Sequence, residues 1–452
     1  MNMKKFYVHR TCPCGEVKGI GTDSYQLFKG IRYAAAKRWE APEEVTSWEG
    51  IYDATAAGPW CFQRRAFIKE KTAVEQFYYN EIVEKETCTF SEDCLYLNIW
   101  TPPTGDNLPV VVFIHGGSYE TGGGTNPSHD GTSYTDRGVV CVTINYRLNA
   151  FASAYGDGIT GNFGVQDQAC ALKWLQCNIS AFGGDPNRVT IMGESAGAMS
   201  VQHMIFTPLA KGLFSGAVML SGGGILDECF SIRTPETAIE IWQKVKDAFG
   251  VQSLHELKTV DPGKLYCTWK GICDSEPRFA FPAIPVVDGT VIPNDPRTMV
   301  KAGEINGVPS ILSVLSEDMW PRSLYHTILE WGELTDQAGL PKVYGMYMDR
   351  AVPGGDHGAY HGCDVRYAFC SLDRSWRPYE DIDYRIANDM IDFFVALAAN
   401  GVPAVEGKAE WKPLCGGNRQ FMRFGDDACA MCDVPEEHLD EVQKRGKPFP
   451  SV

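Results

Sequence analysis

The 452-residue sequence has no run of about 18 apolar residues, the length that a helix needs to cross a membrane. Residues 1–15 carry Lys4, Lys5 and Arg10 but no apolar stretch long enough for the core of a secretory signal peptide. Internal repeats and low-complexity tracts are absent as well. These absences argue against a membrane-spanning or exported protein and predict a cytoplasmic one.

Positive charge is also scarce. Lys and Arg number 41 against 57 Asp and Glu, which gives a net charge of −16 with neutral histidines. A surface this acidic repels polyanions, so neither nucleic acid nor an anionic membrane is expected as the main partner. The charge balance favours neutral or cationic small molecules as substrates.

The 16 cysteines lack the spacing of a zinc site. The tightest pairs are Cys12-Pro-Cys14 and Cys429-Ala-Met-Cys432, and a Cys-x-Cys pair does not form the knuckle that a zinc ribbon needs. We therefore predict no metal site, and we expect most cysteines to act as small buried hydrophobic residues.

The length and a hydrophobic content of 44% allow one large α/β domain with insertions. Residues 109–114 and 139–144 are nearly continuous apolar runs rich in β-branched residues, which is typical of strands buried on both faces of a sheet. Further strands of this kind alternate with helices along the chain. We predict strands at 95–100, 189–192, 217–220, 309–315, 343–347 and 420–424, and helices at 67–86, 165–179 and 382–400.

This alternation predicts an α/β fold with a mostly parallel central sheet and helices on both faces. Residues 15–36 have the pattern of short antiparallel strands at the edge of that sheet. Residues 223 to about 300 interrupt the alternation with mixed helix and proline-rich loop. We interpret this stretch as an insertion that covers the top of the sheet, within a single domain of residues 1–452.

An apolar strand runs directly into Gly193-Glu194-Ser195-Ala196-Gly197, and a helical pattern follows without Pro or Gly through Met204. A serine on a sharp strand-to-helix turn has a strained backbone and needs small neighbours, which the two glycines provide. Such a turn exposes the Ser195 hydroxyl and directs the Ala196 N–H to a developing oxyanion. We predict that Ser195 is a nucleophile.

A serine nucleophile needs a histidine base and an orienting carboxylate, which follow it in the chain order of an α/β-hydrolase. His361 lies in a Gly-flanked loop after a predicted strand, and His357 is its nearest rival. Glu317 and Asp318 follow another predicted strand, at the end of the sheet where such folds place their chemistry. Spacing alone leaves both choices open.

The sequence His115-Gly116-Gly117-Ser118 directly follows the buried strand at 109–114. Glycines let the backbone approach a substrate carbonyl, and a hydrolase oxyanion hole needs a second N–H donor from this early loop. A flexible glycine loop is the alternative, and Gly122-Gly123-Gly124 nearby fits that description. The downstream Gly-x-Ser-x-Gly makes an oxyanion hole the better interpretation.

Longer motifs extend this pattern along the chain. They are Phe28–Ala34, Ser91–Asn98, Asn145–Arg147, Gly161–Gln168 and Phe182–Pro186 followed by Gly193–Gly197. On these motifs, the chain resembles the type-B carboxylesterase family, which includes the cholinesterases and bacterial para-nitrobenzyl esterases. The resemblance spans roughly residues 15–425 and implies an α/β-hydrolase fold without a metal or organic cofactor.

The resemblance implies a catalytic triad of Ser195, His361 and an acid placed after the strand at 309–315. The family has an Asp-Glu pair at that position, whereas this sequence has Glu317-Asp318. Aligning the strand puts the family's glutamate on Asp318. We therefore expect Asp318 to be the acid, with Glu317 as the alternative.

The resemblance also implies an oxyanion hole made of the N–H groups of Gly117, Ser118 and Ala196. The family usually has a third glycine or an alanine where this sequence has Ser118, whose N–H can still donate. Gly116 precedes these donors and supports the same loop.

Other family positions imply supporting contacts beneath the site. Glu194 is expected to lie close to the catalytic histidine, and Glu92 is expected to pair with a buried Arg147. Cys61 and Cys94 fall where secreted relatives close a disulfide loop. Without a leader sequence, we expect these two cysteines to be mostly reduced, with a disulfide between them as the alternative.

Together these observations predict a serine carboxylesterase that hydrolyses small-molecule esters through an acyl-enzyme, as a monomer or homodimer. A lipase, a feruloyl or acetyl-xylan esterase, or an amidase would use the same residues. A non-catalytic cholinesterase-like binding protein is disfavoured, because such proteins typically lack the nucleophile and this chain combines Ser195, His361 and a carboxylate.

Overall fold

The computed structural model describes residues 4–68, 70–71, 73–83, 88–224 and 234–445. A 13-stranded sheet lies at the centre of these residues. Its strands are β1 (Phe6–Cys12), β2 (Gly15–Gly21), β3 (Gln26–Arg32), β6 (Ile51–Asp53), β9 (Tyr96–Thr101), β10 (Leu108–Ile114), β11 (Val140–Ile144), β14 (Gly184–Glu194), β15 (Gly216–Leu220), β16 (Ser310–Leu315), β17 (Val343–Met348), β18 (Phe421–Phe424) and β19 (Ala430–Cys432).

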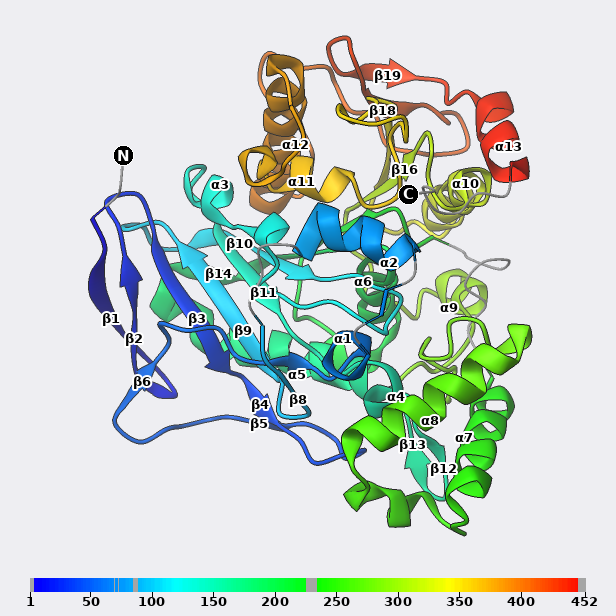
Figure 1. Cartoon of the computed structure of the whole chain (residues 1–452). Coiled ribbons are helices and arrows are strands. Elements are labelled where there is room, and N and C mark those ends of the chain that lie inside the picture. The colour runs from blue at the N-terminus through cyan, green and yellow to red at the C-terminus, as the bar shows by residue number, and fades with distance from the viewer. Residues whose placement is uncertain (1–3, 69, 72, 84–87, 225–233, 446–452) are drawn as a thin grey trace.

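The strands follow the order β1-β2-β3-β9-β11-β10-β14-β15-β16-β17-β18-β19, with β6 beside β2 (Figure 1). Neighbours from β11 to β18 pair in parallel. The pairs β1–β2, β2–β3, β3–β9 and β9–β11 are antiparallel. The predicted α/β-hydrolase arrangement, a mostly parallel sheet with antiparallel N-terminal edge strands, is therefore confirmed.

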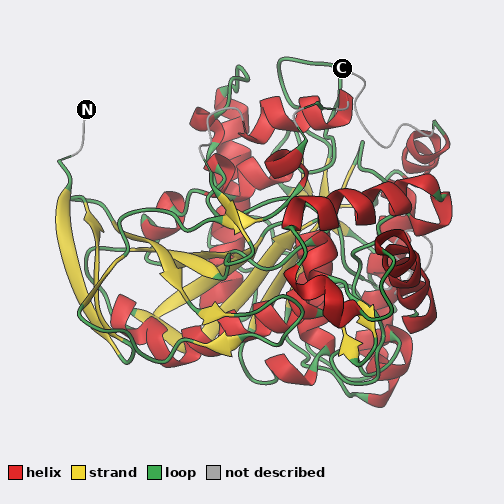
Figure 2. Cartoon of the chain, turned by 60° about the horizontal axis from the view of Figure 1, so that its bottom comes forward, coloured by secondary structure: helices red, strands yellow, loops and turns green. Residues whose placement is uncertain are grey.

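Helices cover both faces of the sheet, as Figure 2 shows. On one face, α5 (Phe163–Asn178) and α6 (Ala196–Phe206) pack against β14. On the other, α12 (Asp381–Asn400) packs against β10 and β14. Side chains of β10 alternate between two hydrophobic cores, with Val110 and Val112 in one and Val111 and Phe113 in the other. The sheet is thus buried on both sides, as its β-branched runs predict.

The remaining helices and strands are shorter or lie at the periphery. The helices are α1 (Arg64–Phe67), α2 (Ala73–Tyr78), the π-helical turn η1 (Tyr79–Val83), α3 (Thr132–Thr135), α4 (Asn149–Ala152), α7 (Pro235–Phe249), α8 (Pro262–Ser275), α9 (Pro296–Ala302), α10 (Pro321–Gln337), α11 (Asp364–Ala368) and α13 (Glu436–Lys444). The strands are β4 (Ala34–Ala35), β5 (Glu43–Glu44), β7 (Trp60–Cys61), β8 (Phe90–Ser91), β12 (Tyr155–Gly156) and β13 (Ile159–Thr160). Among the residues described, every helix is too short or too polar to span a lipid bilayer.

The stretch that interrupts the strand–helix alternation contains α7, α8 and α9, while its residues 225–233 lie outside the described residues. Helices α7 and α8 pack on each other, α7 contacts β12, and α8 contacts α4 (Figure 1). The loop between α8 and α9 brings Phe281 and Ile284 next to Ser195 in one pocket. This loop therefore reaches the C-terminal edge of the parallel strands.

Candidate active site

Ser195 occupies the turn between β14, which ends at Glu194, and α6, which begins at Ala196. Its backbone has φ 55° and ψ −123°, a strained conformation for a residue with a side chain. The two flanking glycines are required by close backbone contacts. A Cβ on Gly193 would lie 2.2 Å from the Gly197 oxygen, and one on Gly197 would lie 2.0 Å from the Ile114 oxygen.

Three side chains from separate loops form one hydrogen-bonded chain. Ser195 Oγ lies 2.9 Å from His361 Nε2, and His361 Nδ1 lies 2.6 Å from Asp318 Oδ1. Asp318 follows β16 and His361 follows β17, so all three residues lie beyond the C-terminal ends of parallel strands. An ionised carboxylate can only accept, so Nδ1 carries a proton and the neutral ring leaves Nε2 free to take one from Ser195.

The backbone holds Asp318 in place. Its Oδ1 accepts a hydrogen bond from the Met319 N–H at 2.8 Å, and its Oδ2 accepts one from the Leu315 N–H at 3.1 Å. Only 1% of the Asp318 surface is exposed. A carboxylate fixed at both oxygens orients the imidazole rigidly, which is the role of the acid in a Ser-His-Asp triad.

Glu317 points away from His361. Its Oε1 lies 3.1 Å from His438 Nε2 and 3.6 Å from Arg445 Nη2, both at α13. His357, the rival base, lies edge-on against the Phe77 ring with 5.1 Å between ring centroids. The structure therefore brings together Ser195, His361 and Asp318 from the sequence candidates and leaves Glu317 and His357 outside the cluster.

Nearby carboxylates strongly affect the pKa of His361. Burial disfavours the imidazolium, but the carboxylates of Asp318, Glu194 and Asp364 outweigh burial and raise the pKa of His361 to about 9. Burial also opposes ionisation of Asp318, yet the charge and hydrogen bond of His361 leave the Asp318 pKa below its usual value.

Glu194 lies on the other side of the imidazole, with its Oε1 3.4 Å from His361 Nε2, as the family resemblance implies. Burial, opposed by His361 and reinforced by Asp318, raises the pKa of Glu194 to about 7. This carboxyl therefore changes charge near neutral pH, beside the nitrogen that is hydrogen-bonded to Ser195 Oγ.

The loop after β10 supplies candidate oxyanion donors. A Cβ on Gly116 would lie 2.5 Å from the backbone carbonyl oxygen of Glu194. A Cβ on Gly117 would lie 2.3 Å from the backbone carbonyl oxygen of Thr121, so both positions need glycine. Ser118 has φ 57°, a left-handed conformation that favours glycine. Ser118 and Ala196 line one pocket with Ser195, so both residues lie beside the nucleophile candidate.

The expected Glu92–Arg147 ion pair is wrong. Arg147 pairs with Asp167 on α5, with Nη2–Oδ1 at 2.7 Å and Nε–Oδ2 at 2.8 Å, and both side chains are buried. The planar guanidinium matches the two oxygens of Asp167, which also accepts the Arg147 backbone N–H. Glu92 pairs with Arg38 instead, through Nε–Oε2 at 2.8 Å. Both residues are therefore in ion pairs, but with different partners.

Cys61 and Cys94 are buried side by side as free thiols. The hydrogen bond to Cys61, followed by burial, raises the pKa of the Cys94 thiol well above its usual value. Cys61 Sγ also accepts a hydrogen bond from the Leu148 N–H at 3.3 Å.

Sequence patterns missed several residues that support the His361 loop. Asp364 is fully buried on α11, where burial and then the charges of Glu194 and Asp318 raise its pKa. The Tyr78 hydroxyl donates to the His361 carbonyl at 3.1 Å. More than 280 residues separate Tyr78 from His361 along the chain, so local spacing could not indicate this hydrogen bond.

Glu81, on the π-helical turn η1, ties the same loop to the rest of the fold. Its Oε2 accepts from the Tyr360 hydroxyl at 3.0 Å and lies 2.9 Å from Nε of the buried Arg377. The residue before His361 is thus hydrogen-bonded to a buried ion pair. This network is a second feature that sequence patterns did not indicate.

A small pocket, here called the catalytic pocket, lies at the nucleophile and is open to solvent. Its lining residues are Ser118, Tyr119, Ser195, Ala196, Met199, Phe281, Ile284 and Met319. Apart from Ser195, Ser118 and the Tyr119 hydroxyl, these side chains are apolar. The pocket therefore suits an uncharged organic group bound next to the nucleophile.

A mostly parallel sheet with helices on both faces, a serine on the β14–α6 turn and an acid and histidine on later loops define an α/β-hydrolase. The chain belongs to the carboxylesterase family, whose family model matches residues 8–328.

Individual relatives agree with this assignment. The chain is 35% identical over 322 residues to the para-nitrobenzyl esterase of Bacillus subtilis (strain 168), covering 68% of this chain and 62% of that protein. It is also 35% identical over 352 residues to human cocaine esterase, covering 74% of this chain and 60% of that protein. The chain thus spans about three fifths of the length of these curated relatives. A solved PNB esterase structure superposes with a TM-score of 0.81 at 26% identity, covering 99% of this chain and 100% of the other.

Proposed function

We propose that the chain is a serine carboxylesterase that hydrolyses small-molecule carboxylic esters. The observation that carries this proposal is the chain of hydrogen bonds from Ser195 through His361 to Asp318, at the edge of a mostly apolar pocket. The loop between α8 and α9 contributes a wall of that pocket, which supports a covering role for the insertion. The cytoplasmic location, the monomeric or homodimeric state and the absence of a cofactor stay predictions from the sequence.

In the first half-reaction, Ser195 Oγ attacks the ester carbonyl carbon while its proton passes to His361 Nε2. The carbonyl electrons move onto oxygen, and the N–H groups of Gly117, Ser118 and Ala196 donate to this oxyanion. Asp318 stabilises the imidazolium that forms. The intermediate collapses, the alkoxide leaves, and His361 Nε2 returns the proton to the departing oxygen.

In the second half-reaction, water attacks the acyl-enzyme carbonyl and gives its proton to His361 Nε2. The second tetrahedral intermediate expels Ser195 Oγ, which recovers that proton, and the carboxylic acid departs. Each step uses the same base and the same N–H donors. The cycle returns the site to its starting protonation state.

Covalent trapping tests this proposal directly. We expect the full chain to release p-nitrophenol from p-nitrophenyl acetate, and we expect an alkyl fluorophosphonate to abolish that activity with one label per chain. Peptide mass spectrometry should locate the label on Ser195, because its hydroxyl is the activated one. Ester hydrolysis that persists while Ser195 is fully labelled, or a chain without esterase activity, would overturn the proposal.

The pH dependence tests the electrostatics. The base must be neutral to accept a proton, so kcat/KM should rise with pH through a pKa above 6.5, near the value of about 9 for His361. Glu194, with a pKa of about 7, is mostly ionised at pH values near the His361 pKa, and its charge there stabilises the imidazolium. Glu194→Gln should therefore move the rising limb to lower pH. A limb that stays unchanged in this variant would show that Glu194 does not act on His361.

A further inference from the structure

Two consecutive residues in the loop after β10 have an unusual backbone. Ser118 and Tyr119 both have positive φ angles, 57° and 59°. Side chains disfavour this conformation, which glycine adopts without steric cost. A residue with a side chain keeps it only where the surrounding structure holds it in place. In the proposed mechanism, this loop supplies the N–H groups of Gly117 and Ser118 to the oxyanion, so the contacts that hold the loop also set the position of these two donors.

Backbone hydrogen bonds fix the shape of this loop. The N–H groups of Glu120 and Thr121 both donate to the Gly117 carbonyl at 2.9 Å. The Tyr119 carbonyl accepts a hydrogen bond from the Asn149 N–H at 2.8 Å, which joins the loop to α4. The third donor of the proposed mechanism lies elsewhere, because Ala196 is the first residue of α6. The oxyanion hole therefore also depends on how the loop is held against α6.

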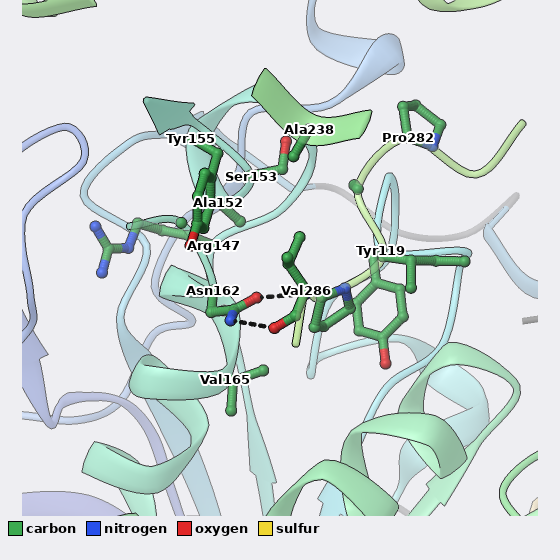
Figure 3. Close-up of a pocket in the computed structure, with 15 residues that line it drawn as sticks. Tyr119, Arg147, Ala152, Ser153, Tyr155, Asn162, Val165, Ala238, Pro282 and Val286 are labelled. Carbon is green, nitrogen blue, oxygen red and sulfur yellow. Dashed lines mark hydrogen bonds between the residues drawn. The ribbon is translucent and has the colours of Figure 1, made fainter. Parts of the chain in front are cut away.

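The side chain of Tyr119 connects the loop with α6. Its hydroxyl lies 3.2 Å from His203 Nδ1, and Figure 3 shows this hydroxyl pointing away from Pro282. Ser200 Oγ lies 3.5 Å from the same hydroxyl and donates to the Ala196 carbonyl at 2.9 Å. Ser200 and His203 are three residues apart on the helix, so they share one face of it. The phenol thus joins the loop to the first turns of α6.

Both partners of the hydrogen bond between Tyr119 and His203 are buried. Burial lowers the pKa of His203 to about 4, so its ring is neutral in the pH range where an imidazole base is active. Burial also raises the pKa of the Tyr119 phenol, which therefore keeps its proton. A protonated phenol and a neutral imidazole can form this hydrogen bond with either tautomer of the ring. Removal of one partner leaves a buried polar group unpaired.

We propose that Tyr119 and His203 are positioning residues for the oxyanion hole. Their hydrogen bond holds the strained loop against α6, so that the loop donors and the Ala196 N–H converge on the same oxygen. This proposal rests on the proposed esterase function. Because oxyanion donors bind the transition state more strongly than the substrate carbonyl, loss of the hydrogen bond should lower kcat and leave KM nearly unchanged.

Steady-state kinetics with p-nitrophenyl butyrate test the proposal. Tyr119→Phe keeps the ring and removes the hydroxyl, while His203→Leu removes the acceptor at a residue outside the described lining of the catalytic pocket. Loss of a whole oxyanion donor costs about a hundredfold or more, so its displacement should lower kcat by about tenfold in each variant. The double variant should be no slower than either single one, because both changes remove the same hydrogen bond. His203→Asn should restore most of kcat, since its amide can bond the phenol.

A transition-state analogue gives the second readout. A trifluoromethyl ketone forms a tetrahedral oxyanion on a serine nucleophile, so its inhibition constant should rise by about the factor by which kcat/KM falls. The matched control is Tyr134→Phe, which also removes a buried hydroxyl, one that donates to the Ala368 carbonyl at 3.0 Å. This control should keep kcat and the inhibition constant within about twofold of wild type, because it leaves the oxyanion donors in place.

Thermal melting of each variant shows whether it has folded, and Tyr119→Phe keeps the test decisive if His203→Leu does not fold. If wild type is active and folded Tyr119→Phe keeps both kcat and affinity for the ketone, the pair does not position the donors and the esterase function stands. A loss confined to KM would contradict the proposal in the same way. If wild type hydrolyses no ester and is not labelled at Ser195, the esterase function fails and this proposal fails with it.

Discussion

Replacing His361 with alanine is expected to lower kcat on p-nitrophenyl butyrate by a factor on the order of a million, because base and nucleophile act as a unit in serine hydrolases. In the proposed mechanism, the imidazole accepts the Ser195 proton, with Nε2 2.9 Å from Oγ. It then protonates the leaving alkoxide. Continuous assay of p-nitrophenol release, with circular dichroism to monitor folding, measures the effect.

The matched control for this variant is His357→Ala, four residues earlier in the same loop. The His357 side chain is 21% exposed, stacks edge-on against Phe77 and makes no contact with Ser195 among the described residues. Its loss should leave most of the activity. A folded His361→Ala protein with near-normal turnover, or a His357→Ala protein that has lost turnover, would assign the base to His357.

The nucleophile turn was predictable because its requirements are local. A buried strand, two glycines and a helix follow one another within about twenty residues, and each glycine is explained by backbone atoms in direct contact. The parallel strands were predictable for the same reason, since burial on both faces leaves continuous apolar runs. The strand β1 was missed because most of its side chains are exposed or partly exposed, so no hydrophobic period marks it.

The segment 67–86 shows a different limit of sequence reasoning. Its helical pattern corresponds to the end of α1, the short helix α2 and the π-helical turn η1, while residues 69, 72 and 84–86 lie outside the described residues. The π-turn coincides with Glu81, whose buried ion pair with Arg377 is a tertiary contact. Tertiary contacts of this kind override local helix propensity and leave no mark in a single sequence.

The sequence also did not predict which buried acidic and basic side chains pair with each other. Arg147 has two acidic candidates, and Asp167 binds it because α5 presents that carboxylate to both guanidinium nitrogens. Glu92 then pairs with Arg38.

The order Glu317-Asp318 becomes understandable once the local backbone is known. Glu317 forms a parallel bridge with Tyr360, and its N–H donates to the Ala359 carbonyl at 3.1 Å. Successive side chains on extended backbone point to opposite sides. Asp318 and His361, each one residue beyond the bridge, therefore face each other, while Glu317 faces α13.

Asp318→Asn is accordingly expected to lower kcat by about ten thousandfold, because the amide can hold the imidazole in the wrong tautomer and cannot stabilise the imidazolium. The same change removes the nearest negative charge, so the rising limb of the kcat/KM profile should move to lower pH in the residual activity. Both kcat and the pH profile of kcat/KM are measured with p-nitrophenyl butyrate from about pH 5 to about pH 10, a range that includes the usual histidine pKa.

Glu317→Gln is the control that separates the two carboxylates. It removes an equal charge one residue away but weakens only the contacts with His438 and Arg445, at a side chain that is 26% exposed. Its turnover should stay within about twofold of wild type, since exposed ion pairs contribute little. The reverse pattern, with Glu317→Gln inactive and Asp318→Asn active, would require the loop after β16 to turn over in solution and would move the acid to Glu317. The bridge between Glu317 and Tyr360 fixes which of the two carboxylates faces His361. An inactive Glu317→Gln with an active Asp318→Asn would therefore also contradict this bridge. The two variants thus test both the local backbone and the identity of the catalytic acid.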